Sequence, residues 1–241
     1  KTFFTILFKY NKLKKQFHQF SDDFKYNKNR DFEINWNDRL LMIGDDTKET
    51  DFDTHYTYHP AWAARELAKI KPKCHIDISS ILSFSTLVSA FIPVDFYDYR
   101  PANIILPNLK INKVDLKSLP FKDNSIESIS CMHTVEHIGL GRYGDKIDPS
   151  GDIKSIIELE RVLAKNGFLI FVVPIGKPKI IFNAHRIYSY KQIIKQFSNL
   201  KLIKFSLIPD SAQKTGMIEN ASEEDASSQI YGCGCFLFQK I

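Results

Sequence analysis

Short apolar segments alternate with segments of helical character from about residue 58 onward, and this alternation restricts the fold more than any other feature. Strands that alternate with helices build βαβ units, whose strands lie parallel in one sheet. Residues 168–173 are all apolar, as expected for a strand that is covered on both faces. The segments predicted to be parallel strands are 74–78, 94–98, 109–114, 126–132 and 168–173.

Four helices and two further strands complete the predicted order. The helices are expected over 59–68, 81–91, 152–163 and 189–196. We expect Pro60 in the first helical turn, Asn166 and Gly167 as a C-cap, and Pro174 at a strand end. Strands over 201–208 and 234–239 should form an antiparallel pair at the end of the chain. The pattern predicts a Rossmann-like α/β fold: a mostly parallel sheet with helices on both faces and an antiparallel last strand.

Residues 1–54 are interpreted as a basic helical segment and a loop, and residues 55–241 as the α/β domain. Apolar residues recur at roughly helical spacing over residues 1–30, with lysines between them. This apolar face can pack on the domain, on a second subunit in a homodimer, or weakly on a membrane surface. A short strand or turn is expected near 40–43, and the acidic, Ser-rich residues 209–228 are interpreted as a flexible flap.

Composition excludes several functional classes. The chain has 241 residues and a formal net charge of +5, without the dense basic stripe of a nucleic-acid binder. No segment approaches the roughly 20 apolar residues of a membrane-spanning helix. The four cysteines suit a reducing cytoplasm, and Cys233 and Cys235 have no second pair nearby, so no zinc site is predicted. Abundant Lys, Asn, Ile and Phe are typical of an AT-rich bacterial genome.

Polar residues at the ends of the predicted strands are the candidate site residues. In open α/β sheets, ligands bind beyond the carboxyl ends of the strands. The residues at these ends are Asp77, Ser79, Ser80, Asp98, Asp115 and the segment 133–137.

Five stretches carry a family resemblance: HIDISS (75–80), VDLKSLPF (114–121), SCMHTVEHI (130–138), ELERVLA (158–164) and NAHRIY (183–188). In this order they resemble the class I S-adenosylmethionine-dependent methyltransferases. More narrowly, they resemble methyltransferase-like domains from bacterial surface-polysaccharide gene clusters. The resemblance spans about residues 55–197, and it implies a small-molecule acceptor, a sugar or nucleotide sugar.

The resemblance also implies roles for the strand-end residues. Asp77 and the turn of Ser79 and Ser80 would lie beside the methionine part of S-adenosylmethionine. Asp98 would accept hydrogen bonds from both ribose hydroxyls, a task that suits a carboxylate. Asp115 and Leu116 would flank the adenine, and His133 would lie beside the reacting methyl group.

The first loop departs from the family pattern, because residues 79–84 contain no glycine where the family has Gly-x-Gly-x-Gly. Ile81 or Leu82 would then be free to fill the methionine pocket. Three functions therefore stay open. The protein is a methyltransferase, a non-catalytic methyltransferase-like subunit, or a sugar-modifying enzyme that has lost the methyl donor.

The string H-x-x-E-H at 133–137 matches that of some zinc peptidases, whose chemistry needs both histidines on one helix. Here the string follows a strand, so no metal is predicted. His133 or His137 is interpreted as a general base, with Glu136 beside them, since a neutral imidazole suits that task near neutral pH. The alternative is that Glu136 and His137 brace the next helix.

Two loops are interpreted as substrate-facing. Arg142 and Tyr143 lie in a glycine-rich loop and would meet sugar hydroxyls or a phosphate, and the alternative is a solvated arginine on a turn. His185, Arg186 and Tyr188 follow the fifth strand and would contact the acceptor. The alternative for this second group is a loop anchor in which Arg186 pairs with an acid.

A cluster of His and Tyr precedes the first predicted helix. It would close over the cofactor pocket or form an aromatic packing patch. Its members are His55, Tyr56, Tyr58 and His59.

Overall fold

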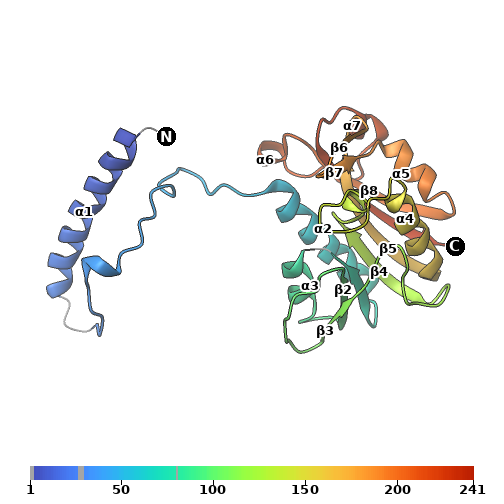
Figure 1. Cartoon of the computed structure of the whole chain (residues 1–241), viewed down its shortest axis with the longest axis horizontal. Helices are drawn as coiled ribbons and strands as arrows, with labels where there is room; N and C mark the ends of the chain where they lie inside the picture. Colours follow the sequence, from blue (N-terminus) through green and yellow to red (C-terminus); the bar gives the residue numbers. More distant parts are fainter. Residues whose placement is uncertain (1–2, 27–29, 80) are drawn as a thin grey trace. The chain divides into compact units, whose positions relative to one another are not determined.

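The computed structural model describes residues 3–26, 30–79 and 81–241, and the chain divides into two units, Lys1–Phe52 and Asp53–Ile241 (Figure 1). The first unit holds α1 (Phe3–Lys25) and the 3-10 turn η1 (Trp36–Asp38). The Trp36 ring packs edge-on against Phe17, with 5.1 Å between ring centroids. The helix expected over residues 1–30 is present in its described part, whereas residues 40–43 form no strand.

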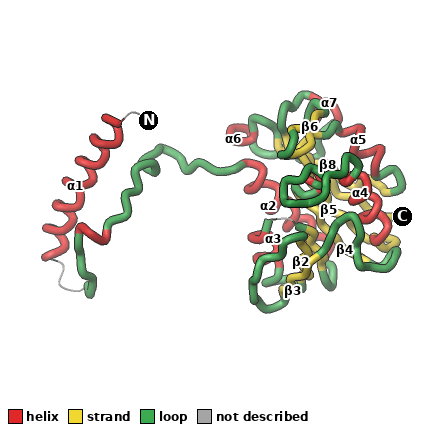
Figure 2. The backbone as a smooth tube through the Cα atoms, in the orientation of Figure 1, coloured by secondary structure: helices red, strands yellow, loops and turns green. Residues whose placement is uncertain are grey.

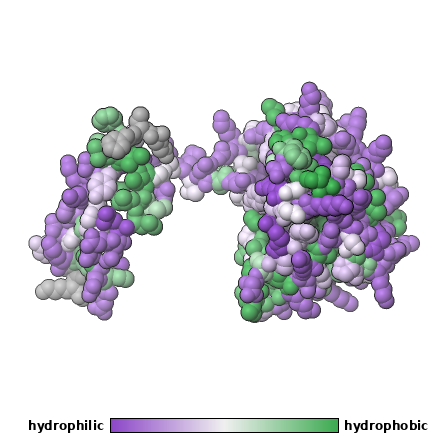
Figure 3. Space-filling view, viewed as in Figure 1, coloured by the Kyte–Doolittle hydropathy of each residue, from purple (hydrophilic) through white to green (hydrophobic). Residues whose placement is uncertain are grey.

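Apolar side chains of α1 remain exposed within this unit. Phe4 is 79% exposed and Phe8 is 72% exposed, and the space-filling view shows apolar residues among hydrophilic ones there (Figure 3). In the described part of the chain, no helix combines the length and the apolar character needed to cross a membrane.

The second unit is built on a seven-stranded sheet in the order β3-β2-β1-β4-β5-β9-β8. β1 to β5 pair in parallel, and β9 runs antiparallel to both β5 and β8. The predicted α/β fold with an antiparallel last strand is confirmed. Its strands are β1 (His75–Ile78), β2 (Val94–Asp98), β3 (Leu109–Lys113), β4 (Ile126–Met132), β5 (Leu163–Ile175), β8 (Leu200–Ile208) and β9 (Gly232–Lys240).

Helices cover both faces of this sheet, as predicted (Figure 2). α2 (Thr54–Ile70) and α3 (Leu82–Val88) pack on one face. α4 (Gly151–Val162) and α5 (Tyr190–Gln196) pack on the other. A separate two-stranded ribbon, β6 (Lys179–Ile181) with β7 (His185–Ile187), was not predicted.

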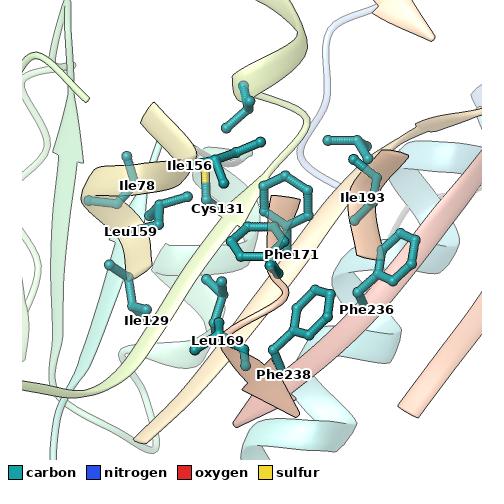
Figure 4. Packing of buried hydrophobic residues seen from close by; sticks show 14 of the residues in the cluster. Ile78, Ile129, Cys131, Ile156, Leu159, Leu169, Phe171, Ile193, Phe236 and Phe238 are labelled. Atoms are coloured by element: carbon teal, nitrogen blue, oxygen red, sulfur yellow. The ribbon is translucent and has the colours of Figure 1, made fainter. Parts of the chain in front are cut away.

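Alternation along β5 places its side chains in two hydrophobic clusters. Leu169 and Phe171 point toward α4 and α5 and pack with Phe236 and Phe238 of β9 (Figure 4). Ile170 belongs to the cluster under α2 and α3. A strand buried on both faces needs a continuous apolar sequence, and residues 168–173 supply it.

The first domain helix begins earlier than its sequence pattern suggested. Asp53 caps α2 by accepting a hydrogen bond from the Tyr56 N–H at 2.9 Å, so the helix starts at Thr54. Pro60 therefore lies inside the helix instead of in its first turn. As a result, His55 and His59 lie one helical turn apart on the same face.

The expected C-cap at Asn166 and Gly167 is wrong. α4 ends at Val162 and β5 begins directly at Leu163, so both residues belong to the strand. The β4–β5 register shifts between Ile126 and Ser128, and Asn166 takes a φ of +64° beside this irregularity. Pro174 also lies within β5 and pairs with Cys233.

Residues 209–228, predicted to be a flexible flap, carry two short helices. These are α6 (Ala212–Thr215) and α7 (Glu223–Ser227). Ile218 and Leu207 exchange backbone hydrogen bonds at 2.8 and 2.9 Å, and Ala221 N–H donates to Phe205 O. These bonds tie the segment to the edge strand β8.

A chain of buried hydrogen bonds joins β1 to β4. Ser130 Oγ donates to Asp77 Oδ1 at 2.6 Å, so it accepts from His75 Nε2–H at 2.8 Å. His75 Nδ1 is then the acceptor for Ser128 Oγ–H, also at 2.8 Å. Ser85 Oγ of α3 donates to the second oxygen of Asp77. Every polar atom in this chain has a partner, which is what a buried polar network needs to be stable.

A second buried group anchors the ribbon to the start of α4. Arg186 Nη1 donates to Ile138 O at 2.7 Å, and Arg186 Nε lies 3.4 Å from Asp152 Oδ2. Tyr188 donates its hydroxyl to the same carboxylate at 3.0 Å. The side chains of Arg186 and Asp152 are both at least nine-tenths buried. Each charge therefore needs the other to offset the cost of its removal from water.

Burial lowers the pKa of His75 to about 3, against 6.5 for an exposed histidine. Between those two values the unfolded chain binds a proton that the folded one does not. The His75 contribution to stability is thus complete above pH 6.5 and is lost as the pH falls toward 3, at up to about 1.4 kcal/mol per pH unit. We predict that the free energy of unfolding of His75→Gln, measured with urea between pH 7 and 4, falls less steeply with decreasing pH than that of the wild-type protein. Equal slopes for both proteins would contradict this assignment.

Removing the Arg186 charge should destabilise the domain. Arg186→Met leaves Asp152 buried without its cation, so we expect the free energy of unfolding to fall by about 3 kcal/mol. Arg142→Met is the matched control, because Arg142 is exposed and should change stability by less than about 0.5 kcal/mol. Urea unfolding measures both values. Similar small losses of unfolding free energy in the two variants would contradict a stabilising role for the buried Arg186–Asp152 pair.

Candidate functional site

Two adjoining hollows lie at the carboxyl ends of the parallel strands, and together we call them the strand-end cleft. They measure about 120 and 170 Å³. The residues that line both are Ser79, Tyr99, Thr134, His137, Ile138 and Tyr143. A roomier hollow of about 340 Å³ between α2 and α3 has mostly apolar walls with Lys71 as its charged residue, which is poorly suited to acid–base chemistry.

The glycine-free turn after β1 bends through Ser79. Ser79 takes a φ of +53°, a left-handed conformation that glycine adopts more easily. Its N–H and hydroxyl both donate to Tyr97 O, at 2.7 and 3.1 Å, and Thr134 Oγ1 donates to Ser79 O at 3.0 Å. These bonds hold the turn against β2 and against the segment after β4.

Neither apolar residue of the turn lines the cleft. Ile81 packs against the hydrophobic cluster under α2 and α3, and the Leu82 side chain is 37% exposed. Ser80 was expected at the cofactor, but it lies outside the described residues. The cleft is therefore open beside Ser79 in the part of the turn that the structure describes.

The structure brings three of the predicted cofactor residues to the cleft in addition to Ser79 and His133. Asp98 lines one hollow at the end of β2, and its carboxylate accepts a bond from the Arg100 N–H at 2.6 Å. Asp115 and Leu116 line the other hollow; Asp115 is exposed and Leu116 is buried. This pairing offers a polar and an apolar wall to the same space.

Asp77 lies in neither hollow. Its side chain is fully buried and accepts bonds from Ser85 and Ser130. A carboxylate held in this way braces the strand that carries the turn.

His133 sits immediately after β4 with a φ of +52°. Its Nδ1–H donates to Glu136 Oε1 at 2.8 Å, which leaves the Nε2 lone pair facing Cys233 Sγ at 3.3 Å. Burial raises the pKa of Glu136, but the hydrogen bond from His133 and the electrostatic effects of His133 and His137 together keep the pKa of this carboxyl below its ordinary value. Glu136 thus fixes the orientation of the His133 ring.

His137 lines both hollows and has a different partner. Its Nδ1 lies 2.6 Å from Ala184 O, so Nδ1 carries the hydrogen and Nε2 keeps a lone pair. Arg142 Nη1 donates to the same carbonyl at 3.2 Å. His133 Nδ1 and His137 Nε2 both face Glu136 Oε1, at 2.8 and 3.8 Å, so the two rings meet at this carboxylate and not at a common metal position, in contrast to the pattern of zinc peptidases.

Tyr143 closes one side of the cleft between two arginines. The guanidinium carbons of Arg100 and Arg142 lie 4.6 and 5.2 Å from the centre of its ring. The loop is shaped by glycines: a Cβ on Gly139 would stand 2.0 Å from Asp148 O. Asp145 accepts bonds from the N–H groups of Gly139 and Tyr143, so the loop forms braced turns.

Two of the three predicted acceptor residues after β5 are structural. Arg186 and Tyr188 are buried in the anchor with Asp152, so the prediction that they touch the substrate is corrected in favour of the loop-anchor alternative. His185 is half-buried, and its ring lies 5.0 Å from Tyr231 and 6.3 Å from His137. It remains near the site.

Residues from α2 and β9 also reach this edge of the sheet. The His55 ring stacks on His133 at 5.3 Å and on Tyr231 at 5.1 Å. Burial lowers the pKa of His55 to about 4, helped by the nearby His133, so its imidazole is neutral at physiological pH. The sequence showed the histidines near residue 55 but gave no sign that Cys233 would meet them, because 100 residues separate Cys233 from His133.

The fold is that of the class I methyltransferases. The YcgJ protein from Bacillus subtilis superposes with a TM-score of 0.53 at 15% identity, covering 76% of this chain and 98% of that one. A 1,6-didemethyltoxoflavin-N1-methyltransferase from Burkholderia thailandensis, solved with S-adenosylhomocysteine, gives 0.53 at 9% identity and covers 77% and 80%. A putative sarcosine dimethylglycine methyltransferase from Galdieria sulphuraria gives 0.52 at 15% identity and covers 75% and 84%.

Sequence comparison reaches less far. A family model described as Caenorhabditis protein of unknown function, DUF268, matches residues 110–228, just under half of the chain. No curated protein matches the sequence. The similarity to solved structures thus establishes the architecture of this chain.

Proposed function

We propose that this protein transfers a methyl group from S-adenosylmethionine to a hydroxyl of a sugar or nucleotide sugar. The observation that carries the proposal is the open strand-end cleft, which has Asp98 in one hollow and Asp115 with Leu116 in the other. When bound, S-adenosylmethionine would supply a methyl group activated on a positively charged sulfur.

The described residues fit a nucleoside. Asp98 would accept hydrogen bonds from the ribose hydroxyls, because a carboxylate offers several lone pairs. Leu116 would pack on the adenine face and Asp115 would accept from its amino group. The left-handed Ser79 replaces the family's glycine without closing the cleft.

His137 is the better candidate for the general base. Ala184 fixes its Nδ1–H, so its Nε2, 3.8 Å from Glu136 Oε1, keeps the lone pair that would take a proton from an acceptor hydroxyl. His133, the other candidate, has its Nδ1 committed to Glu136 and its Nε2 directed at Cys233. Glu136 is fully buried and acts on these rings without touching the substrate.

The cleft rim suits a hydroxylated or phosphorylated acceptor. Arg100 and Arg142 flank the Tyr143 ring, and the His185 ring lies 6.3 Å from that of His137. Guanidinium groups bind phosphate oxygens in bidentate fashion, and an aromatic ring provides a face for a sugar. The choice of a sugar, and of surface-polysaccharide biosynthesis as its setting, rests on the sequence resemblance.

A non-catalytic methyltransferase-like subunit is the second candidate. The two hollows are each smaller than the roughly 300 Å³ at which ligand pockets usually begin, which favours this alternative unless the loops open on binding. Binding of the cofactor product separates the two functions directly.

Isothermal titration with S-adenosylhomocysteine is predicted to show one site. Asp98→Ala should weaken binding about 10- to 100-fold, because hydrogen bonds to a charged group contribute roughly 1.5–3 kcal/mol. Asp95→Ala is the matched control: Asp95 lies on the same strand, pairs loosely with Lys110 and does not line the cleft. Folded wild-type protein that gives no heat at high concentration would favour the non-catalytic subunit.

Loss of the base should slow transfer without loss of cofactor affinity. A thermal-shift panel of UDP-, GDP- and dTDP-sugars, measured with S-adenosylhomocysteine present, identifies the acceptor. With that acceptor, His137→Gln is predicted to lower kcat by about 10²- to 10⁴-fold while the Kd for S-adenosylhomocysteine stays unchanged. An unchanged kcat would exclude His137 as the base.

A further inference from the structure

Three buried side chains of metal-binding type meet beside the strand-end cleft. His55 comes from the first turn of α2, His133 follows β4, and Cys233 lies near the start of β9. One ligand atom of each lies within 4.8 Å of the other two. His133 Nε2 and Cys233 Sγ are 3.3 Å apart. Zinc bonds of about 2.0–2.3 Å place tetrahedral ligand atoms roughly 3.3–3.6 Å from one another, so the His133–Cys233 pair already has this spacing and His55 would move closer by at most about 1.5 Å.

We infer that His55, His133 and Cys233 bind a zinc ion and leave its fourth coordination position open to an external ligand. The inference goes beyond methyl transfer and does not depend on it.

The ring orientation of His133 supports metal binding. Histidines that bind zinc usually donate their other ring N–H to a carboxylate, which fixes the ring and makes the ligating nitrogen more basic. Glu136 accepts that bond at 2.8 Å, and the opposite nitrogen faces Cys233. The Glu136 carboxylate thus already orients the His133 ring so that Nε2 points to the proposed metal position.

Charge balance points the same way. Glu136 is fully buried, and its Oε2 finds no hydrogen-bond partner among the described residues. A zinc ion with one thiolate carries a charge of +1, which the Glu136 carboxylate neutralises. A buried carboxylate without such compensation is costly.

The ligand set favours zinc over the hard cations. Thiolate and imidazole are soft or borderline ligands, whereas magnesium and calcium require oxygen ligands. Among the described residues this cluster has three ligands, the number typical of zinc sites that keep a position for water or substrate. His59, whose Nε2 lacks a partner in the described part of the chain, packs edge-on against His133 but is not one of the three.

The site differs from the zinc peptidase pattern that its sequence contains. Of the two histidines in H-x-x-E-H, only His133 joins the cluster, because the string folds as a left-handed residue followed by the 3-10 turn η2 (Val135–His137). Cys233 takes part and Cys235 does not.

The test uses the full chain, stripped with a chelator and then titrated with zinc and with cobalt, without any methyl donor. We predict one zinc per chain by metal analysis, and a thiolate-to-cobalt charge-transfer band in the near ultraviolet. Imidazole added to the cobalt protein should change the visible spectrum by taking the fourth position. Protein that binds less than 0.1 equivalent, on the order of contamination, would overturn the proposal.

Four variants assign the ligands. Cys233→Ser should abolish the charge-transfer band, and His55→Ala should weaken zinc binding more than about 100-fold. Glu136→Gln should weaken it about 10- to 100-fold, as loss of a carboxylate behind a ligating histidine does. Cys235→Ser is the matched control on the same buried strand and should keep the band and the affinity.

Circular dichroism of each metal-free variant shows whether it is folded, and only folded variants are compared. A charge-transfer band that survives Cys233→Ser, or that disappears in folded Cys235→Ser, would contradict the assigned ligands. S-adenosylhomocysteine titrations on the metal-free protein report on the methyl-transfer proposal separately, so the two can fail independently.

Discussion

The hydrogen-bond chain from Ser128 through His75 and Ser130 to Asp77 is the interaction on which the site depends. It sits between β1 and β4, the two central parallel strands, and its direction is set by the single neutral tautomer that satisfies every member. Because these hydrogen bonds fix β1 against β4, they also fix the positions of the residues that follow the carboxyl ends of the two strands. A polar network of this kind favours one pairing register of the two strands over shifted registers. Hydrophobic contacts alone specify the register less strictly.

Both of those strand ends use a left-handed residue that is not glycine. Ser79 and His133 have φ values of +53° and +52°, and each adopts a conformation that costs roughly 1 kcal/mol or more for an L-residue. The Ser79 turn is held by bonds to Tyr97 and from Thr134, which offset that cost. The cleft is therefore bounded by two turns that carry side chains, those of Ser79 and His133. A glycine-rich loop would present only its backbone to a ligand. This is the physical basis on which the protein departs from the usual pattern of its fold.

The sequence predicted the architecture well and the site only partly. Periodicity located the parallel strands because their segments are largely apolar and are separated by polar turns. Strand-end logic pointed to Asp98, Asp115 and His137, which line the cleft, and their roles there stay predictions. It failed where a long-range contact outweighs a local signal. Asn166 resembled a helix C-cap, but it lies within β5, where the register between β5 and β4 shifts. Arg186 resembled a substrate contact, but it is buried and pairs with Asp152. The approach of Cys233 to His133 depends on the antiparallel placement of β9, which no local pattern encodes.

The cleft and the metal-binding cluster share the wall formed by His133, so a nucleoside and a zinc ion would lie on two sides of one residue. The central claim is that the glycine-free turn leaves room for a nucleoside beside Asp98. A crystal structure of the protein soaked with S-adenosylhomocysteine tests it most directly. We predict ribose density within hydrogen-bond distance of the Asp98 carboxylate and adenine density against Leu116. Clear density for the ligand elsewhere, or a turn at Ser79 that fills this space, would contradict it.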